Sequence, residues 1–400
     1  MARLWPRVPA RIARLAASDV SSLTTQVLLA AFAVAAVFGA IVQRTGFCTM
    51  GAVADVVTMG DWTRMRQWAM AAGVACAGFA LLAASGTLNV TQTLYASTRW
   101  LWLSALAGGF VFGFGMVLSS GCVSKTLVRA GAGNLKSVVV ALVAAVGAFA
   151  TLKGITAVVR AGTVDKVAID MGGNADLGSL LARGTGLSPG IAALATGLVL
   201  AAILLGWAFA DGQARRAGSV LAGAGVGATV LAAWWVTGSL GHLPEHPETL
   251  QEAWLATNST RAEALSFVAP AGFALDWLLF FSDANKRLTV GIVSVWGVLA
   301  GSALSALLRG EFRWEGFAGT SDLGHHLAGG LLMGVGGVTA LGCSVGQGVT
   351  GLSTLSLTSL TAVPAMIAGA VAALHYQLRR VEREAAAAVS GSAPARTGRP

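Results

Sequence analysis

The sequence is poor in charged residues. Only 11% of its 400 residues are Asp, Glu, Lys or Arg, whereas a soluble domain carries about 25%. So few charges cannot cover a water-facing surface, which excludes an ordinary soluble enzyme. Hydrophobic residues make up 55% and the mean hydropathy is +0.71. Several segments of about 20 residues carry almost no charge, which is the length of a helix that crosses a bilayer. The sequence therefore predicts an all-α, polytopic membrane protein.

The usual signatures of catalysis are also missing. The four cysteines show no CxxC or metal-finger spacing, which argues against a zinc site. There is no P-loop, no Ser-His-Asp order and no pair of carboxylates, which argues against an ATP-driven pump within this chain. We expect no catalytic residue, no metal and no cofactor. The net charge of +9 comes from residues between the apolar runs and at the two ends. This distribution fits membrane anchoring and does not indicate nucleic-acid binding.

The apolar runs predict nine membrane spans. They lie at about 25–43, 69–85, 100–119, 137–158, 190–210, 218–236, 289–308, 326–341 and 361–378. An apolar piece from Phe267 to Phe281 is too short to cross and is either re-entrant or interfacial. We divide the chain into a basic tail (1–23), a first half (24–160), a linker with one span (161–215), a second half (216–380) and a disordered tail (381–400). The stretch from Met1 to Ala17 can lie as an amphipathic helix on the membrane surface.

An internal repeat relates the two halves. Its matching residues are Gly113, Gly115, Gly121 and Cys122 in one copy and Gly334, Gly336, Gly342 and Cys343 in the other, at a constant offset of 221. Four spans, then one, then four more would turn the second half upside down, which predicts an inverted-topology repeat. The distribution of Lys and Arg favours an outer N-terminus and an inner C-terminus, although the basic N-terminal tail argues for the opposite.

Three cysteines share one local pattern. Cys48, Cys122 and Cys343 each follow a span and precede a short polar piece rich in Gly, Ser or Thr. Such a piece is tolerated at membrane depth only inside protein or along a cavity, so we expect half-helices whose N-termini form an anion site. The other candidate substrate-binding residues are Gly46, Gly121, Ser124, Lys125, Gly342, Ser344 and Gly346. The alternative is that these cysteines only fill the core, which is our interpretation of Cys76.

Five polar positions have two interpretations each. Lys125 and Arg129 either concentrate anions near the site or lie on a solvated loop face. Lys153 falls inside the fourth predicted span, so it is either functional or extends toward the nearby interface. The adjacent His325 and His326 start a span, and an interfacial role explains them better than metal binding.

The cysteine motifs resemble the YeeE/YedE family of sulfur transporters, which includes thiosulfate transporters. The stretches that carry the resemblance are TGFCTMGAVADV, GFGMVLSSGCVSKTLVRAGAGN and LLMGVGGVTALGCSVGQGVTGLSTLSL. With the span pattern they cover most of residues 25–378. The resemblance implies an hourglass pore in the bacterial inner membrane, where Cys48, Cys122 and Cys343 handle the terminal sulfur of thiosulfate in turn. It also implies a cytosolic sulfurtransferase or sulfur carrier as partner. Lys125 departs from the pattern, because the family often has a small residue there.

Three functions remain open at this point. The first is transport of a small anionic sulfur compound, thiosulfate or a relative, through a cysteine-lined pore. The second is a membrane sulfur relay, in which a cysteine forms a transient persulfide and passes sulfur to a cytosolic partner. The third is a pore for another solute or a structural membrane subunit.

Overall fold

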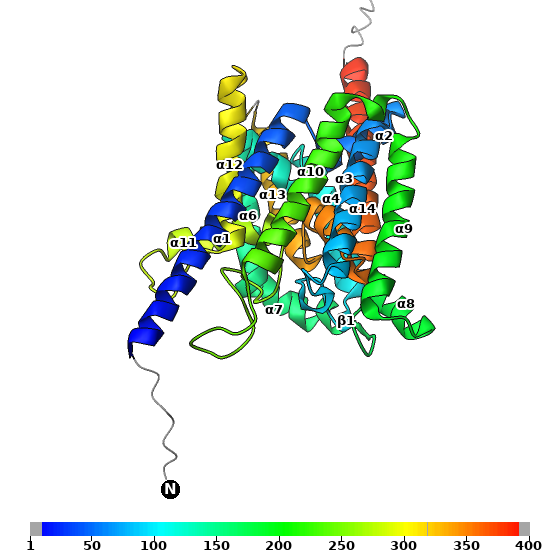
Figure 1. The fold of residues 1–400 in the computed structure, drawn as a ribbon. Coiled ribbons are helices and arrows are strands. Elements are labelled where there is room, and N and C mark those ends of the chain that lie inside the picture. Colours follow the sequence, from blue (N-terminus) through cyan, green and yellow to red (C-terminus); the bar gives the residue numbers. More distant parts are fainter. Residues whose placement is uncertain (1–9, 318, 392–400) are drawn as a thin grey trace, which may run out of the picture.

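The computed structural model describes residues 10–317 and 319–391 and consists almost entirely of helices (Figure 1). The long helices are α1 (Ala10–Thr45), α3 (Thr63–Ala84), α4 (Trp102–Leu118), α6 (Leu135–Lys153), α9 (Pro189–Phe209), α10 (Ala217–Trp235), α12 (Val290–Leu308), α13 (Thr320–Thr339) and α14 (Leu357–Gly391). Shorter helices, helical turns and strand pairs fill the gaps between them.

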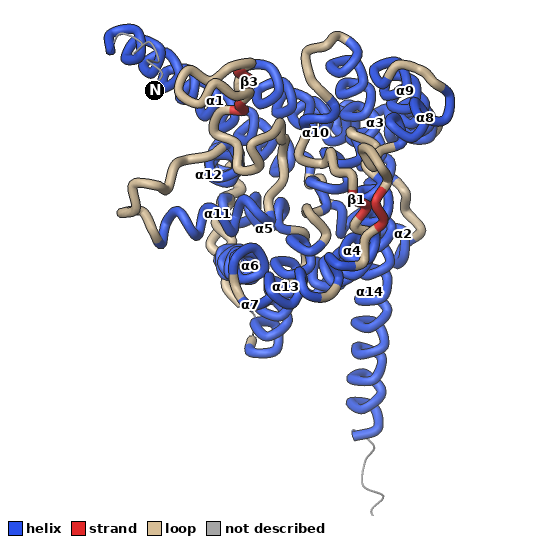
Figure 2. The backbone as a smooth tube through the Cα atoms, turned by 90° about the horizontal axis from the view of Figure 1, so that it is seen from below, coloured by secondary structure: helices blue, strands red, loops and turns tan. Residues whose placement is uncertain are grey.

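The short helices are α2 (Thr49–Met59), α5 (Val123–Gly131), α7 (Ile155–Gly162), α8 (Leu177–Thr185) and α11 (Val268–Leu279). The helical turns are η1 (Val90–Gln92), η2 (Val164–Lys166), η3 (Gln213–Arg215), η4 (Val236–Leu240) and η5 (Gly346–Gly351), the last two with π-type winding. Two antiparallel strand pairs join β1 (Arg99–Trp100) to β2 (Ile169–Asp170) and β3 (His242–Leu243) to β4 (Ala253–Trp254). Viewed down the bundle, α5 lies near the centre of the ring of long helices (Figure 2).

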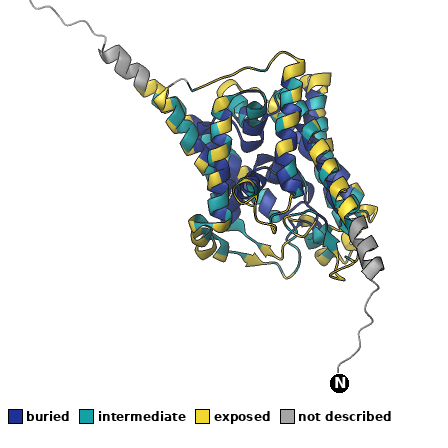
Figure 3. Ribbon diagram, turned by 90° about the vertical axis from the view of Figure 1, so that its left-hand side faces the viewer, coloured by how far each residue is buried: buried dark blue, intermediate teal, exposed yellow. Residues whose placement is uncertain are grey.

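Burial follows the pattern of a body inserted in lipid. Large apolar side chains face outward on the peripheral helices, for example Ile191, Val199 and Ile203 on α9. The interior holds fully buried rings such as Phe112 and Trp234. Figure 3 shows this change from exposed outer faces to a buried centre. The fold is therefore the all-α, polytopic membrane architecture that the composition predicts.

Within the described residues, eight helical segments are long and apolar enough to cross a membrane. The predicted span at 326–341 corresponds to α13 (Thr320–Thr339), which does not meet that standard. Its first turns carry Asp322, His325 and His326, and glycine is frequent along it, so its hydropathy is low. It lies between α4 and α6, where close packing against protein takes the place of contact with lipid.

The packing of the long helices follows an inverted repeat. Helix α1 packs on α12 as α10 packs on α3, and α4 packs on α14 as α13 packs on α6. Helices α4 and α13 pair with each other and run antiparallel. A Cβ atom placed on Gly108 would lie 2.8 Å from the Gly336 carbonyl oxygen, and one on Gly115 would lie 2.8 Å from that of Gly329. Glycine allows the two backbones to approach this closely.

Several predicted boundaries differ from the structure. Helix α1 is continuous from Ala10, so residues 10–17 of the predicted surface helix Met1–Ala17 belong to the same helix as the first span, which begins at Asp19. Residues 1–9 lie outside the described residues. Helix α14 extends to Gly391, so the predicted disorder is wrong for 381–391, where an alanine-rich sequence favours helix. Helix α6 ends at Lys153, whose ammonium pairs with Asp276 at 3.1 Å and is half-exposed. Lys153 is therefore at a helix end and not inside a span.

Candidate functional site

The two Gly-Cys breaks of the repeat have the same backbone structure. In each, the glycine N–H bonds at 2.8 Å to a carbonyl five residues earlier, Gly121 to Met116 and Gly342 to Gly337. The residue before each glycine is left-handed, with φ of 57° at Ser120 and 61° at Leu341. This is a common way to end a helix. It redirects the chain so that the next residue, a cysteine, begins a new helical segment.

A third break places Cys48 in the same role. Helix α1 ends at Thr45, the left-handed Gly46 (φ 68°) turns the chain, and Cys48 is the N-cap of α2. The Cys48 sulfur accepts a hydrogen bond from the Gly51 amide at 3.4 Å. An N-cap that accepts from the third residue of its helix is usually Ser, Thr, Asp or Asn. Here a thiol fills that position.

The other two site cysteines also begin helical segments. The Cys343 sulfur accepts from the Gly346 amide at 3.3 Å. Cys122 is the N-cap of α5, and its sulfur lies 3.2 Å from the Ser124 hydroxyl. All three thiols are buried and free. The predicted half-helices after the cysteines are thus present, as α2, α5 and the helical segment that contains η5.

The breaks bring these thiols together. The side chains of Cys48 and Cys122 are close enough to interact with each other. The Ser344 hydroxyl faces Cys122 as well, and the backbone N–H of Phe267, at the start of α11, faces Cys343. Four helical N-termini therefore meet around three thiols. Their free N–H groups and dipoles favour an anion at this point.

A cavity of about 340 Å³ opens toward one end of the bundle. It is lined by Gly342, Tyr95, Arg99, Arg160 and Glu263, among others. The Tyr95 hydroxyl donates to the Gly346 carbonyl, so this cavity reaches the segment that follows Cys343. Burial raises the pKa of the Glu263 carboxyl, which lies in the loop before α11, to about 7.

A second cavity, of about 520 Å³, opens at the opposite end. Its lining is rich in charge and includes Lys125, Arg129, Lys136, Arg313, Glu311, Glu315 and Asp322. The first cavity touches Val290 at the start of α12, and the second touches Glu311 just beyond its end. The thiols thus lie between two openings. Lys125 lies nearest to them on the basic side, close enough to act electrostatically on Cys48 and Cys122.

The predicted site residues have different structural roles. Cys48, Cys122, Ser124, Lys125 and Ser344 present side chains at the centre. Gly46, Gly121 and Gly342 shape the turns, and the Gly346 amide binds the Cys343 sulfur. Contact of any of them with a substrate stays a prediction.

Sequence reasoning missed one residue that braces the second break. The fully buried Gln347 donates from its side-chain amide to the Ala340 carbonyl and accepts from the Ser359 hydroxyl. Gln347 thus ties the end of α13 to the start of α14. A polar amide inside the glycine-rich GCSVGQG stretch was the available signal.

Cys76, by contrast, lies within α3 with its sulfur donating to the Leu352 carbonyl at 3.4 Å. It begins no helix and is not at a break, which fits its interpretation as a packing residue.

Broken helices whose N-termini meet inside a membrane bundle are the architecture of a transporter. The family model described as sulphur transport matches residues 44–372, so the chain belongs to the sulphur-transport family, which confirms the YeeE/YedE resemblance. It is 27% identical over 332 residues to the thiosulfate transporter TsuA of Spirochaeta thermophila, covering 80% of this chain and 90% of the relative. It is 25% identical over 363 residues to the Escherichia coli TsuA, covering 89% of this chain and 96% of the relative.

Proposed function

We propose that this protein transports thiosulfate or a closely related sulfur anion along a path through the three thiols, without catalysing a reaction. The observation that carries the proposal is the meeting of Cys48, Cys122 and Cys343 at helical N-termini between two open cavities. The relatives named as thiosulfate transporters support the choice of substrate.

The chemistry of the centre suits a two-ended anion. Thiosulfate has a charged sulfonate end and a softer terminal sulfur. Helical N-termini stabilise the charge, and a neutral thiol is a weak donor that holds sulfur briefly and releases it. Conduction needs sites that are favourable enough to enter and weak enough to leave. A series of thiols meets both needs.

The charges at the two ends suggest an orientation. The end that contains Lys125, Arg129 and Lys136 is rich in basic residues, and basic segments remain inside in membrane proteins. We place that end in the cytoplasm of a bacterial inner membrane. A sulfurtransferase or sulfur carrier that collects the anion there is the partner that fits this direction.

The test compares two buried thiols. Cys122→Ala and Cys76→Ala each remove one buried sulfhydryl, but only Cys122 lies on the proposed path. Purified variants in proteoliposomes are assayed for uptake of labelled thiosulfate. We expect the Cys122 variant to lose most uptake and the Cys76 variant to keep it. Equal uptake by Cys122→Ala and the native protein would reject the role of the thiol.

A second candidate function is covalent sulfur relay, favoured by the position of Cys122 at the N-terminus of α5 beside Lys125. A Cys122 thiolate would attack the terminal sulfur of thiosulfate, forming a persulfide and releasing sulfite. A cytosolic thiol would then take the sulfur. Intact-mass analysis after thiosulfate exposure distinguishes the two functions, because only the relay leaves one added sulfur atom on a cysteine.

A further inference from the structure

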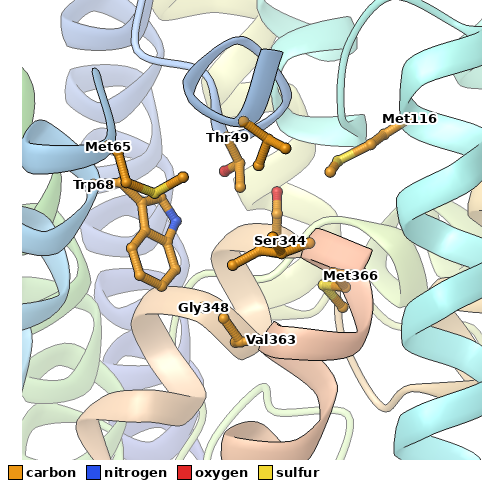
Figure 4. Close-up of a pocket in the computed structure, with 10 residues that line it drawn as sticks. Thr49, Met65, Trp68, Met116, Ser344, Gly348, Val363 and Met366 are labelled. Atoms are coloured by element: carbon orange, nitrogen blue, oxygen red, sulfur yellow. The ribbon is translucent and has the colours of Figure 1, made fainter. Parts of the chain in front are cut away.

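A small cavity beside the thiols has an unusual lining. It measures about 10 Å³ and is bordered mainly by apolar side chains, including Met65, Met116 and Met366. Three residues with polar side-chain groups also line it: Thr49, Trp68 and Ser344. Figure 4 shows these three groups directed toward the space between them.

These polar atoms are buried and unsatisfied. Thr49 is 8% exposed, Trp68 9% and Ser344 2%. Among the residues that the structure describes, none of the three atoms has a hydrogen-bond partner, although the Ser344 hydroxyl also faces the Cys122 thiol. Buried polar groups are nearly always hydrogen-bonded, so three orphans around one cavity point to a missing acceptor.

The chain positions of these groups connect them to the site. Thr49 directly follows Cys48, and Ser344 directly follows Cys343. Trp68 comes from α3 and packs on Gly348, where an added Cβ atom would lie 2.7 Å from the indole ring. The absence of a side chain at Gly348 therefore lets the indole N–H reach the cavity. Two of the three polar residues that line the cavity therefore directly follow a site cysteine in the chain.

The chemistry of the lining specifies its ligand. An indole N–H is a donor only, and both hydroxyls are able to donate. The groups that line the cavity include no carboxylate and no cation. The lining is therefore a set of uncharged donors that is suited to bind an oxygen acceptor. A volume of about 10 Å³ holds about one water-sized group, which is the size of a single sulfonate oxygen.

We propose that Thr49, Trp68 and Ser344 form an oxyanion pocket that binds a sulfonate oxygen of the passing anion while its terminal sulfur contacts the thiols. This inference rests on the proposed function and makes it more specific. The pocket selects a sulfur anion that bears oxygen, such as thiosulfate, over hydrosulfide, which has none. The three residues recognise the substrate and take part in no reaction.

The first experiment removes the donors one at a time. Thr49→Val keeps the shape of the side chain but loses the O–H, and Trp68→Phe keeps an aromatic ring but loses the N–H. The matched control is Trp234→Phe, because Trp234 is also buried but its N–H already bonds to Ser353 at 3.0 Å. Uptake of labelled thiosulfate is measured in proteoliposomes, with hydrosulfide as competitor.

We expect the KM for thiosulfate to rise about tenfold in Thr49→Val and Trp68→Phe, as loss of a hydrogen bond to a charged group implies. Inhibition by hydrosulfide should become stronger relative to thiosulfate, and Trp234→Phe should behave as the native protein does. Variants that transport with native KM and native discrimination would overturn the proposal, because the cavity would then hold only water.

A second measurement does not depend on transport. In the NMR spectrum of the ¹⁵N-labelled protein in detergent, the indole signal of Trp68 is assigned as the one that is absent from Trp68→Phe. Titration with thiosulfate should shift this signal and leave that of Trp234 in place. A Trp68 signal that does not move at saturating thiosulfate refutes the pocket. Native uptake that is lost on removal of Cys122 would in that case still support the proposed function, so the two failures are distinguishable.

Discussion

The inverted repeat makes a quantitative prediction about two glycines. Gly334 on α13 and Gly113 on α4 are counterparts in the repeat. A Cβ atom on Gly334 would lie 2.7 Å from the Ala148 amide nitrogen and closer still to the Ala144 carbonyl oxygen. A Cβ atom on Gly113 would lie 2.8 Å from the Met366 carbonyl carbon. Both opposing surfaces are backbone and cannot rotate away, so the paired helices must separate.

The cost of Gly334→Ala follows from this geometry. Overpacking a well-packed core costs about 1–3 kcal/mol, and a clash with backbone belongs at the upper end of that range. Alanine improves helix propensity by about 1 kcal/mol, which leaves a net destabilisation of roughly 2 kcal/mol. Because the repeat creates the same kind of contact at Gly113, we expect Gly113→Ala to cost about as much.

Gly324 supplies the matched control on the same helix. It is exposed, and an added Cβ atom would meet nothing within 4 Å. Gly324→Ala should therefore gain helix propensity without a clash and leave stability unchanged or raise it by up to about 1 kcal/mol. On the same helix, Gly334→Ala should therefore lower the free energy of unfolding, whereas Gly324→Ala should leave it unchanged or raise it.

The buried cysteines can be used to measure the stability of the bundle. All four cysteines are buried and free, so a thiol-reactive fluorescent dye reacts only when the bundle opens. Heating in detergent should give a lower midpoint for Gly334→Ala and Gly113→Ala than for the native protein, by a few degrees, and no decrease for Gly324→Ala. A midpoint of Gly334→Ala at or above the native one would refute the close packing of α13 on α6.

Two further predictions concern charge. Lys125→Gln should reduce thiosulfate uptake about tenfold at low ionic strength, since a cation beside the path raises the local anion concentration. Lys125→Arg keeps the positive charge and should retain uptake. An uptake rate of the native protein that does not depend on salt would contradict this role. For Glu263, burial raises the carboxyl pKa from 4.5 to about 7. Between these pH values the folded state binds more protons than the unfolded state. The free energy of unfolding therefore decreases as pH rises from about 4.5 through 7. Glu263→Gln should flatten the pH dependence of the thermal midpoint followed by Trp fluorescence, whereas the exposed Glu248→Gln should leave it unchanged.

Much of the fold could be predicted because it depends on short-range patterns. Low charge and long apolar runs predict the spans, and the repeated Gly-Cys pairs predict both breaks. The short apolar piece after Phe267 becomes α11. Each of these features depends on residues close together in sequence, so periodicity and composition are enough to find them.

Other features depend on contacts between distant residues. The N–H of Trp68 matters because Thr49, Ser344 and Gly348 surround it, and no local pattern distinguishes it from the other tryptophans. The apolar run at 326–341 predicts a span, but the position of α13 between α4 and α6 depends on contacts with those distant helices. The sequence misplaces the ends of α1 and α14, because charged and small residues are also typical of a disordered tail.

The repeat is symmetric in backbone but not in chemistry. Helices α2 and α11 both start near the thiols, but α2 starts at Cys48 and α11 at Phe267. The counterpart of Lys125 at the repeat offset is Gly346, so the ammonium occurs on one side only, and Glu263 lines the cavity on the other. Lys125 therefore favours an anion next to the thiols on that side of the proposed path. Such an asymmetry changes occupancy and rate but cannot move the equilibrium between two compartments. Sustained net import through a passive path requires a lower electrochemical potential of the anion at the basic end, and consumption by a sulfur-accepting partner there would maintain it.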